Sequence, residues 1–297
     1  MKRREFVGAL IALKSSPLNA VARGFRWAIC SETFAGKSFA EICDLTRRTG
    51  YTGLEIDPSN LSDDPVALTA SQRAVLKKTM LERDVKYAGL HSFLKAPKGL
   101  HLTTPDAGVR RRTWDYFDSL IDLTADLGDG AVMVLGSSKQ RQAIEGATPA
   151  EAVERLADGL ARMAPHAERR GVTILMEPLE PHLCNVINSM DEAVAIVKKV
   201  GSHAVESMFD SHNTTAETLP LPDVIHKHFS RIRHVHLNEL DGKYPGSGNF
   251  AFAPILKTLR DLDYQGWLSV EVFDFQPDGE TVARSASSYL QRLEREL

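Results

Sequence analysis

Short apolar runs alternate with longer stretches of mixed polarity along nearly the whole chain. The short runs are four to six residues long and rich in β-branched and other apolar side chains, a pattern that predicts buried strands. Eight of them follow one another after Gly24: Phe25–Cys30, Gly53–Ile56, Lys86–His91, Ala131–Leu135, Val172–Met176, Val205–Phe209, Ile232–Leu237 and Trp267–Val272.

In the longer stretches, apolar residues recur every three or four positions, which predicts helices with one buried face. The helices expected from this spacing include Phe39–Arg48, Leu68–Arg83, Val109–Leu127, Ala150–Arg170, Asp191–Val200 and Ile255–Leu262. A glycine precedes several of the strands, at a place where a residue with left-handed backbone often ends a helix. We expect such caps at Gly50, Gly128, Gly171, Gly201 and Gly266.

Eight strand–helix units without a break in composition predict an α/β fold, a single (β/α)8 TIM barrel over residues 23–297. An open doubly wound sheet is the alternative, but it requires a glycine-rich phosphate loop after the first strand. The segment in that place, Cys30–Phe34, has no glycine.

The composition agrees with one barrel. The chain has 297 residues, and an α/β barrel takes roughly 250 as one domain. Its 36 Lys and Arg against 39 Asp and Glu give a net charge of −3, which offers no general attraction to nucleic acid or to a membrane surface. Cys30, Cys43 and Cys184 form no CxxC pair, so we expect core cysteines rather than a zinc knuckle or a disulfide framework.

Residues 1–22 have the order of an export signal. Arg3 and Arg4 precede an apolar run, Phe6–Leu13, and the small residues Ala20–Ala22 follow, as in signals of the twin-arginine type. The apolar run is too short to span a bilayer. We therefore expect an exported or periplasmic protein, and a cytoplasmic one if these residues are only a disordered basic leader.

Four predicted strands end in an ionisable residue. Glu177, Asp210, His236 and Glu271 end the fifth to the eighth strand, at separations of 33, 26 and 35 residues, about one strand–helix unit each. The carboxyl ends of barrel strands form the active site, so the four side chains should surround one point. Clustered carboxylates repel one another unless they take up protons, pair with arginines or bind a cation. Three carboxylates and one imidazole suit Mn²⁺, with Mg²⁺ or Co²⁺ as alternatives.

Several short segments resemble those of one family. They are Met176–Leu179, Phe209–His212, His234–Glu239, Pro245–Gly248 and Ser269–Val272, and together they resemble the xylose isomerase-like TIM barrels, with the ketose 3-epimerases such as tagatose and psicose 3-epimerase closest in pattern. The resemblance implies that Glu177, Asp210, His236 and Glu271 bind the metal. It also implies that Glu177 and Glu271 act as acid and base on a keto-sugar.

This assignment is chemically consistent. Epimerisation or isomerisation begins with the loss of a proton next to a carbonyl, and a divalent metal stabilises the resulting enediolate. Two carboxylates on opposite faces of the sugar can then remove and return the proton. We therefore expect a metal-dependent sugar isomerase or epimerase.

The residues that would grip the sugar depart from the epimerase pattern. Asn213 stands where the pattern has a histidine, with His212 one place earlier, and Gly242 beside Lys243 stands where it has an arginine. Leu183 replaces an acidic residue. The metal ligands match, whereas the substrate and its stereocentre remain open.

Five residues are candidates for substrate binding: His91, His212, Asn213, Lys243 and Phe34. His91 ends the third strand and should face the mouth of the barrel, unless it is a core histidine. Phe34 follows the first strand and would form an aromatic wall, and Lys243 would meet a phosphate or carboxylate, unless they only pack in a loop or face solvent. Glu55 is expected at the rim or paired with a basic residue, and His234 one layer below His236 in a structural role.

Other functions are compatible with the fold. A lyase acting on 3-keto-glycosides would begin with the same proton removal, and a barrel without activity would bind a sugar or a partner protein. An endonuclease would need additional metal ligands near Asn213, Asn249 and Ala251, and these residues are not suitable. The expected partner is a small sugar rather than nucleic acid or a membrane, and a homo-oligomer stays open.

Overall fold

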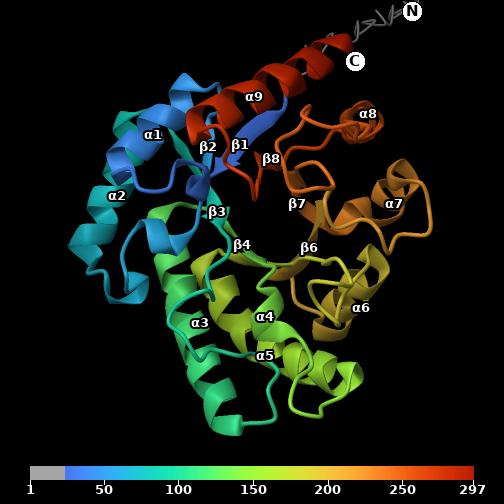
Figure 1. Cartoon of the computed structure of the whole chain (residues 1–297). Coiled ribbons are helices and arrows are strands. Elements are labelled where there is room, and N and C mark those ends of the chain that lie inside the picture. Colours follow the sequence, from blue (N-terminus) through green and yellow to red (C-terminus); the bar gives the residue numbers. More distant parts are fainter. Residues whose placement is uncertain (1–23) are drawn as a thin grey trace, which may run out of the picture.

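The computed structural model describes residues 24–297, which form a closed parallel barrel with helices around it (Figure 1). The predicted leader lies outside these residues. The strands run in sequence order around the barrel: β1 (Arg26–Cys30), β2 (Gly53–Ile56), β3 (Lys86–Leu90), β4 (Val132–Leu135), β5 (Thr173–Met176), β6 (Val205–Asp210), β7 (Ile232–Leu237) and β8 (Trp267–Val270). Closure through the pairing of Ala28 with Ser269 leaves no open sheet edge.

The helices cover the outside of the barrel. They are α1 (Phe39–Arg48), α2 (Ala70–Glu82), α3 (Ala107–Leu127), α4 (Ser138–Arg141), α5 (Pro149–Arg170), α6 (Met190–Val200), α7 (Leu221–His228), α8 (Phe252–Asp261) and α9 (Gly279–Glu296). Ser38, Thr69 and Thr148 each begin a helix with a capping box, in which the hydroxyl accepts from the third helical N–H. Among residues 24–297, no helix has the length and apolar character needed to cross a membrane.

The predicted strands and helices are all present, with ends that differ by a few residues. The single barrel is therefore confirmed, and Cys30, Cys43 and Cys184 are buried and free, as expected. The segments inferred from helical spacing did not include α4, α7 or α9. The four-residue α4 is too short to show a period, and α7, with eight residues, barely exceeds two helical turns.

The predicted left-handed caps are only partly present. The positive φ angles at Gly50, Gly171 and Gly201 confirm three of them. The prediction is wrong for Gly128, which is extended at φ −178°, and for Gly266, where Asp263 instead adopts φ 53°. A Cβ on Gly128 would lie 2.9 Å from the Tyr87 ring, so close packing rather than chain reversal explains this glycine.

Helices α3 and α5 pack unusually closely at Gly159. A Cβ at this position would lie 2.0 Å from the buried ring of Trp114. In an open helix, Gly→Ala stabilises by up to about 1 kcal/mol. Here we expect Gly159→Ala to lower the free energy of unfolding by about 1–3 kcal/mol, because the added methyl overpacks the interface.

Urea denaturation measures this change. The same substitution in a Trp114→Leu background is the control, since the smaller side chain makes room for the methyl group and the penalty should shrink. A higher urea midpoint for Gly159→Ala in the otherwise unchanged chain would contradict the packing described.

Candidate active site

Four adjacent strands bring the predicted ligands to one place. Asp210 and His236 lie on β6 and β7, and Glu177 and Glu271 directly follow β5 and β8. One ligand atom from each lies within 4.8 Å of the others, and all four residues are buried. Within residues 24–297, the salt bridges of these side chains are formed with histidines and none with arginine, so neutralisation by arginines does not account for the cluster.

Without a cation, the carboxylates of the cluster repel one another. Burial and the neighbouring Glu177 and Glu271 carboxylates raise the pKa of Asp210 well above its ordinary value. Burial alone would lower the pKa of His236, but the surrounding carboxylates, Glu55 first, hold it well above normal. A bound divalent cation would supply the positive charge that protons must otherwise provide.

The position of the second ring nitrogen of His236, Nδ1, supports a metal at this point. Its Nδ1 atom is buried and makes no aligned hydrogen bond within the described part of the chain. Glu271 Oε2 lies 3.0 Å and Glu177 Oε1 3.4 Å from it. A buried imidazole nitrogen surrounded by carboxylate oxygens is a suitable ligand set for Mn²⁺, Mg²⁺ or Co²⁺, so the residues fit the metal implied by the sequence.

Glu55 holds the other side of this imidazole. Its carboxylate oxygens lie 3.1 Å from His236 Nε2, and one of them lies 2.8 Å from His234 Nε2. Glu55 and both histidines are fully buried. The expectation that Glu55 lies at the rim is wrong, whereas its pairing and the inward, structural position of His234 are confirmed. Hydrogen bonding to Glu55 places the Nε2 proton and leaves Nδ1 free for a metal.

We expect Glu55→Gln to weaken metal binding by about 10- to 100-fold, because the amide cannot fix the imidazole as a carboxylate does. Titration calorimetry with Mn²⁺ measures the affinity directly, independently of any activity. Glu206→Gln is the matched control, since this buried glutamate on β6 pairs with Arg231 and Arg233, away from the cluster. Equal affinity in Glu55→Gln and the unchanged protein would show that Glu55 does not orient His236.

His91 connects the cluster to the loop after β1. It is 1% exposed, and its Nδ1 lies 3.2 Å from Glu271 Oε1 while its Nε2 lies 2.8 Å from Glu32 Oε2. His91 therefore lies at the mouth of the barrel, as expected, and fixes one oxygen of Glu271. The part played by Glu32 was not foreseen, because nothing in the local sequence indicates a contact 59 residues away.

Asn213 and His212 border the same cluster. The Asn213 amide donates to Asp210 Oδ2, and its own oxygen accepts from the Glu180 backbone N–H at 3.0 Å. The His212 backbone N–H donates to Asp210 Oδ1 at 2.8 Å, while the ring packs edge-on against Phe273. Both residues thus orient Asp210, and both also line the adjoining cavity.

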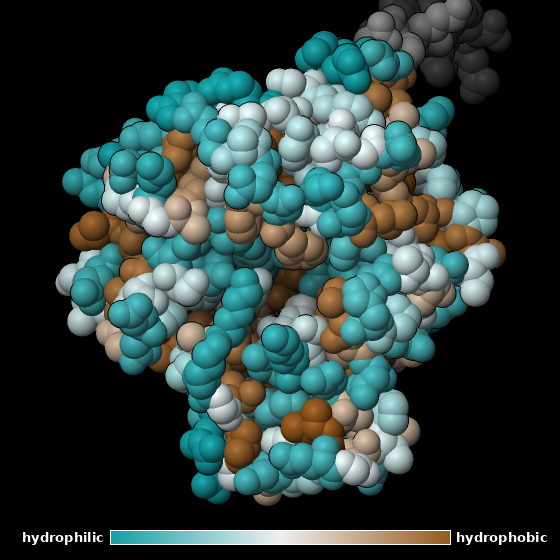
Figure 2. Space-filling view, viewed as in Figure 1, coloured by the Kyte–Doolittle hydropathy of each residue, from teal (hydrophilic) through white to brown (hydrophobic). Residues whose placement is uncertain are grey.

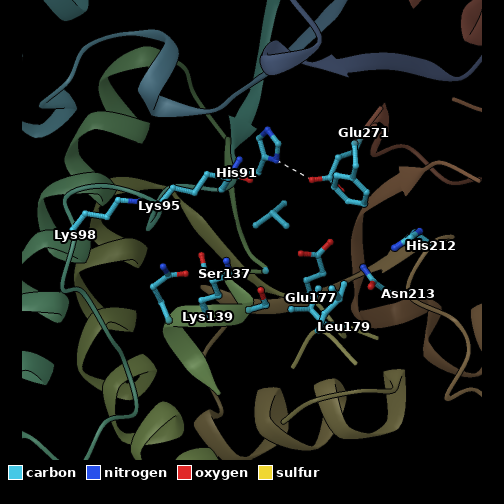
Figure 3. A pocket seen from close by; sticks show the side chains of 17 residues that line it. His91, Lys95, Lys98, Ser137, Lys139, Glu177, Leu179, His212, Asn213 and Glu271 are labelled. Atoms are coloured by element: carbon cyan, nitrogen blue, oxygen red, sulfur yellow. Dashed lines mark hydrogen bonds and ion pairs between the residues drawn. The ribbon is translucent and has the colours of Figure 1, made fainter. Parts of the chain in front are cut away.

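A cavity of about 500 Å³ opens directly above the cluster (Figures 2 and 3). Glu177 and Glu271 reach its wall, and so does His91. Gly136 also lines it; a Cβ there would lie 2.1 Å from Glu177 Oε2, so only glycine lets this carboxylate take its position. The volume is within the range of small-molecule sites.

Two candidates for substrate binding do not reach this cavity. Phe34 is 3% exposed and packs in the core, where its ring lies close to the start of α9 at Gly279. Lys243 is half exposed, and its ammonium group lies 2.9 Å from Asp241 Oδ2. The structure therefore corrects the expected positions of both side chains: one is taken up by the core and the other by a surface ion pair.

Known proteins resemble this chain over most of its length. A family model described as "Xylose isomerase-like TIM barrel" matches residues 43–293. A D-psicose 3-epimerase of Enterocloster bolteae is 33% identical over 250 residues, which cover 80% of this chain and 78% of that protein. A D-psicose 3-epimerase of Agrobacterium fabrum is 27% identical over 79% of each.

Solved structures show the same fold. A D-psicose 3-epimerase from Clostridium cellulolyticum H10 has a TM-score of 0.79 at 20% identity and covers 91% of this chain and 99% of its own. A 3-keto-D-glucoside 4-epimerase from E. coli has a TM-score of 0.77 at 18% identity with the same coverage. At these identities, the structural likeness concerns the barrel alone.

Proposed function

This chain belongs to the xylose isomerase-like TIM-barrel family, and from that premise we propose that it is a divalent-metal-dependent epimerase that inverts a stereocentre next to the carbonyl of a keto-sugar. One observation carries the proposal: four buried side chains that can bind a metal lie close together beneath an open cavity. They are Glu177, Asp210, His236 and Glu271. The similarity to D-psicose 3-epimerases over about four-fifths of the chain supports inversion over elimination or binding without catalysis.

Two carboxylates are placed to move the proton. Glu177 and Glu271 both reach the cavity, and Figure 3 shows their carboxylates pointing toward one another. A divalent cation bound in the cluster supplies Lewis-acid stabilisation of the negative charge on the substrate oxygens. One glutamate removes the proton on one face of the substrate, and the other returns a proton on the opposite face, which inverts the centre.

Each carboxylate is held ready for its role by neighbouring groups. Burial opposes ionisation of Glu271, but His236 and His91 hold its pKa below the ordinary value, so it is ionised and able to accept a proton. The hydrogen bond from His91 to Oε1 also restricts the orientation of this carboxylate. Gly136 leaves space for Glu177 on the other side.

Solvent exchange tests the proposal. In D₂O, the Mn²⁺-loaded protein should place deuterium on the carbon next to the carbonyl of a ketose and should produce its epimer. Release of an aglycone from a 3-keto-glycoside would instead indicate a lyase. Absence of exchange with every ketose and keto-glycoside tested, in protein shown to contain the metal, would refute the proposed function.

We propose Mn²⁺ as the resident metal, because oxygen-rich sites with one imidazole suit it well. Metal analysis of the purified protein tests this choice. We also propose that residues 1–22 direct export. Fusion of this segment to a reporter protein tests export, and replacement of Arg3 and Arg4 by lysine should stop it if the twin-arginine route is used.

A further inference from the structure

Three lysines line one side of the cavity above the active site. Lys95 and Lys98 come from the segment after β3, and Lys139 comes from α4. Figure 3 shows them on the side away from His212 and Asn213. A molecule held at the metal ligands would therefore extend toward these ammonium groups.

Hydrogen bonds connect the two segments that carry the lysines. Leu102 donates its backbone N–H to Gln140 O at 2.6 Å, and Thr103 Oγ1 donates to Arg141 O at 3.0 Å. The buried Arg141 side chain in turn donates to Leu135 O, at the end of β4. The lysine-bearing segments thus have a defined position relative to the barrel.

Two of the three lysines supply positive charge that no acidic side chain of the described range neutralises. Lys95 Nζ lies 3.1 Å from the buried Asp57 carboxylate, whereas Lys98 and Lys139 form no salt bridge with any other residue of the described range. The acidic residues on the cavity wall are Glu177 and Glu271, which belong to the metal cluster. A positive wall in a chain of net charge −3 is a local feature and does not reflect a generally basic surface.

We infer that the substrate carries an oxyanion, a phosphate ester or a carboxylate, at the end of its carbon chain away from the carbonyl. Lys98 and Lys139 bind this group, and Lys95, anchored by Asp57, completes the positive wall. The inference deepens the proposed function and rests on it for the orientation of the substrate. It also fits Leu183, an uncharged side chain of the cavity lining that does not repel an anion.

Binding of unreactive sugar alcohols tests this inference without turnover. With Mn²⁺-loaded protein, titration calorimetry compares glucitol, glucitol 6-phosphate and gluconate. We expect at least one of the two anions to bind about tenfold or more tightly than glucitol, since charge-assisted contacts exceed neutral ones. The advantage should decrease as salt is added, because exposed charges are screened.

The double variant Lys98→Gln/Lys139→Gln should abolish this advantage while glucitol binding stays within about twofold. Lys243→Gln is the matched control, because this lysine is exposed but does not line the cavity, and it should keep the advantage. An advantage for the phosphate alone identifies a phosphate ester, and one for gluconate alone identifies a carboxylate.

Three results would overturn the inference. The first is equal affinity for all three ligands, and the second is an anion advantage that persists in the double variant. The third is an equal loss of affinity for all three ligands in a double variant whose urea midpoint is unchanged. If one of these results is found but neutral ketoses still exchange deuterium with solvent, the proposed function stands and only the inference about the anion is refuted. Absence of any exchange together with an anion advantage would refute the proposed function alone.

Discussion

Replacement of Glu271 by glutamine is expected to lower the rate of deuterium incorporation by about 10²- to 10⁴-fold, the usual contribution of a general acid or base. Glutamine preserves the size of the side chain and one oxygen beside His236, but its amide cannot accept the substrate proton. Glu177→Gln should have a similar effect, because inversion needs a proton donor on one face and an acceptor on the other. Proton magnetic resonance of the ketose in D₂O measures the rate.

The control is Glu280→Gln on α9, where the carboxylate pairs with Arg48 at 2.8 Å on the outside of the barrel. This variant should keep the full rate. The metal content of each variant must be measured as well, because Glu271 is also a predicted ligand. An unchanged exchange rate in metal-loaded Glu271→Gln would remove this residue from the mechanism.

Removal of the divalent metal is expected to abolish exchange, and its return should restore it. The same addition should stabilise the folded protein, by about 2.7 kcal/mol at a free metal concentration 100 times the dissociation constant. The stabilisation arises because the cation relieves repulsion among Glu177, Asp210 and Glu271. Thermal unfolding of stripped and reloaded protein measures it.

The pH dependence has a definite sign. The pKa of Asp210 is raised in the folded, metal-free protein, so this residue still holds a proton at pH values where an unfolded aspartate, with a pKa near 3.8, has lost it. The contribution of Asp210 to the stability of the metal-free protein is therefore lost as pH rises from about 4 through the raised pKa. The metal must displace this proton, so the affinity of the protein for the metal should increase over the same pH range.

Asp210→Asn tests both effects in one variant, since it removes the carboxyl group whose pKa is raised and also an anionic metal ligand. Its metal-free form should be at least as stable as the unchanged metal-free protein near neutral pH, and it should gain little stability from added Mn²⁺. A chelated protein that keeps full exchange activity would refute the requirement for a metal.

The barrel could be predicted from the chain because its signals are local. A short apolar strand such as Ile232–Leu237 and a periodic helix such as Phe39–Arg48 are recognisable within their own few residues, and the structure has both at those bounds. Parallel strands that alternate with helices close into a barrel with all carboxyl ends at one face. The meeting of the four ligands follows from this rule, without knowledge of any single contact.

Contacts outside that rule were not predictable. Glu55 reaches His236 from a strand 181 residues earlier, because barrel closure pairs β1 with β8 and so brings β2 near β7. Glu32 reaches His91 because β1 and β3 flank β2, so that the ends of these two strands lie close together. The direction of a loop side chain also depends on which contacts the rest of the fold offers it, in the core, at the surface or in the cavity. Phe34 turns into the core and Lys243 toward Asp241, and no local pattern distinguishes these positions from a place in the cavity.

By itself, the order of residues determined the kind of fold, the four residues that meet and their suitability for a divalent metal, since strand polarity and side-chain chemistry follow directly from the sequence. The tertiary structure alone decided which groups hold His236 and Glu271 in place, how large the cavity is and that lysines form one of its walls. These properties depend on distances between segments far apart in the chain, which are set by packing of the whole barrel.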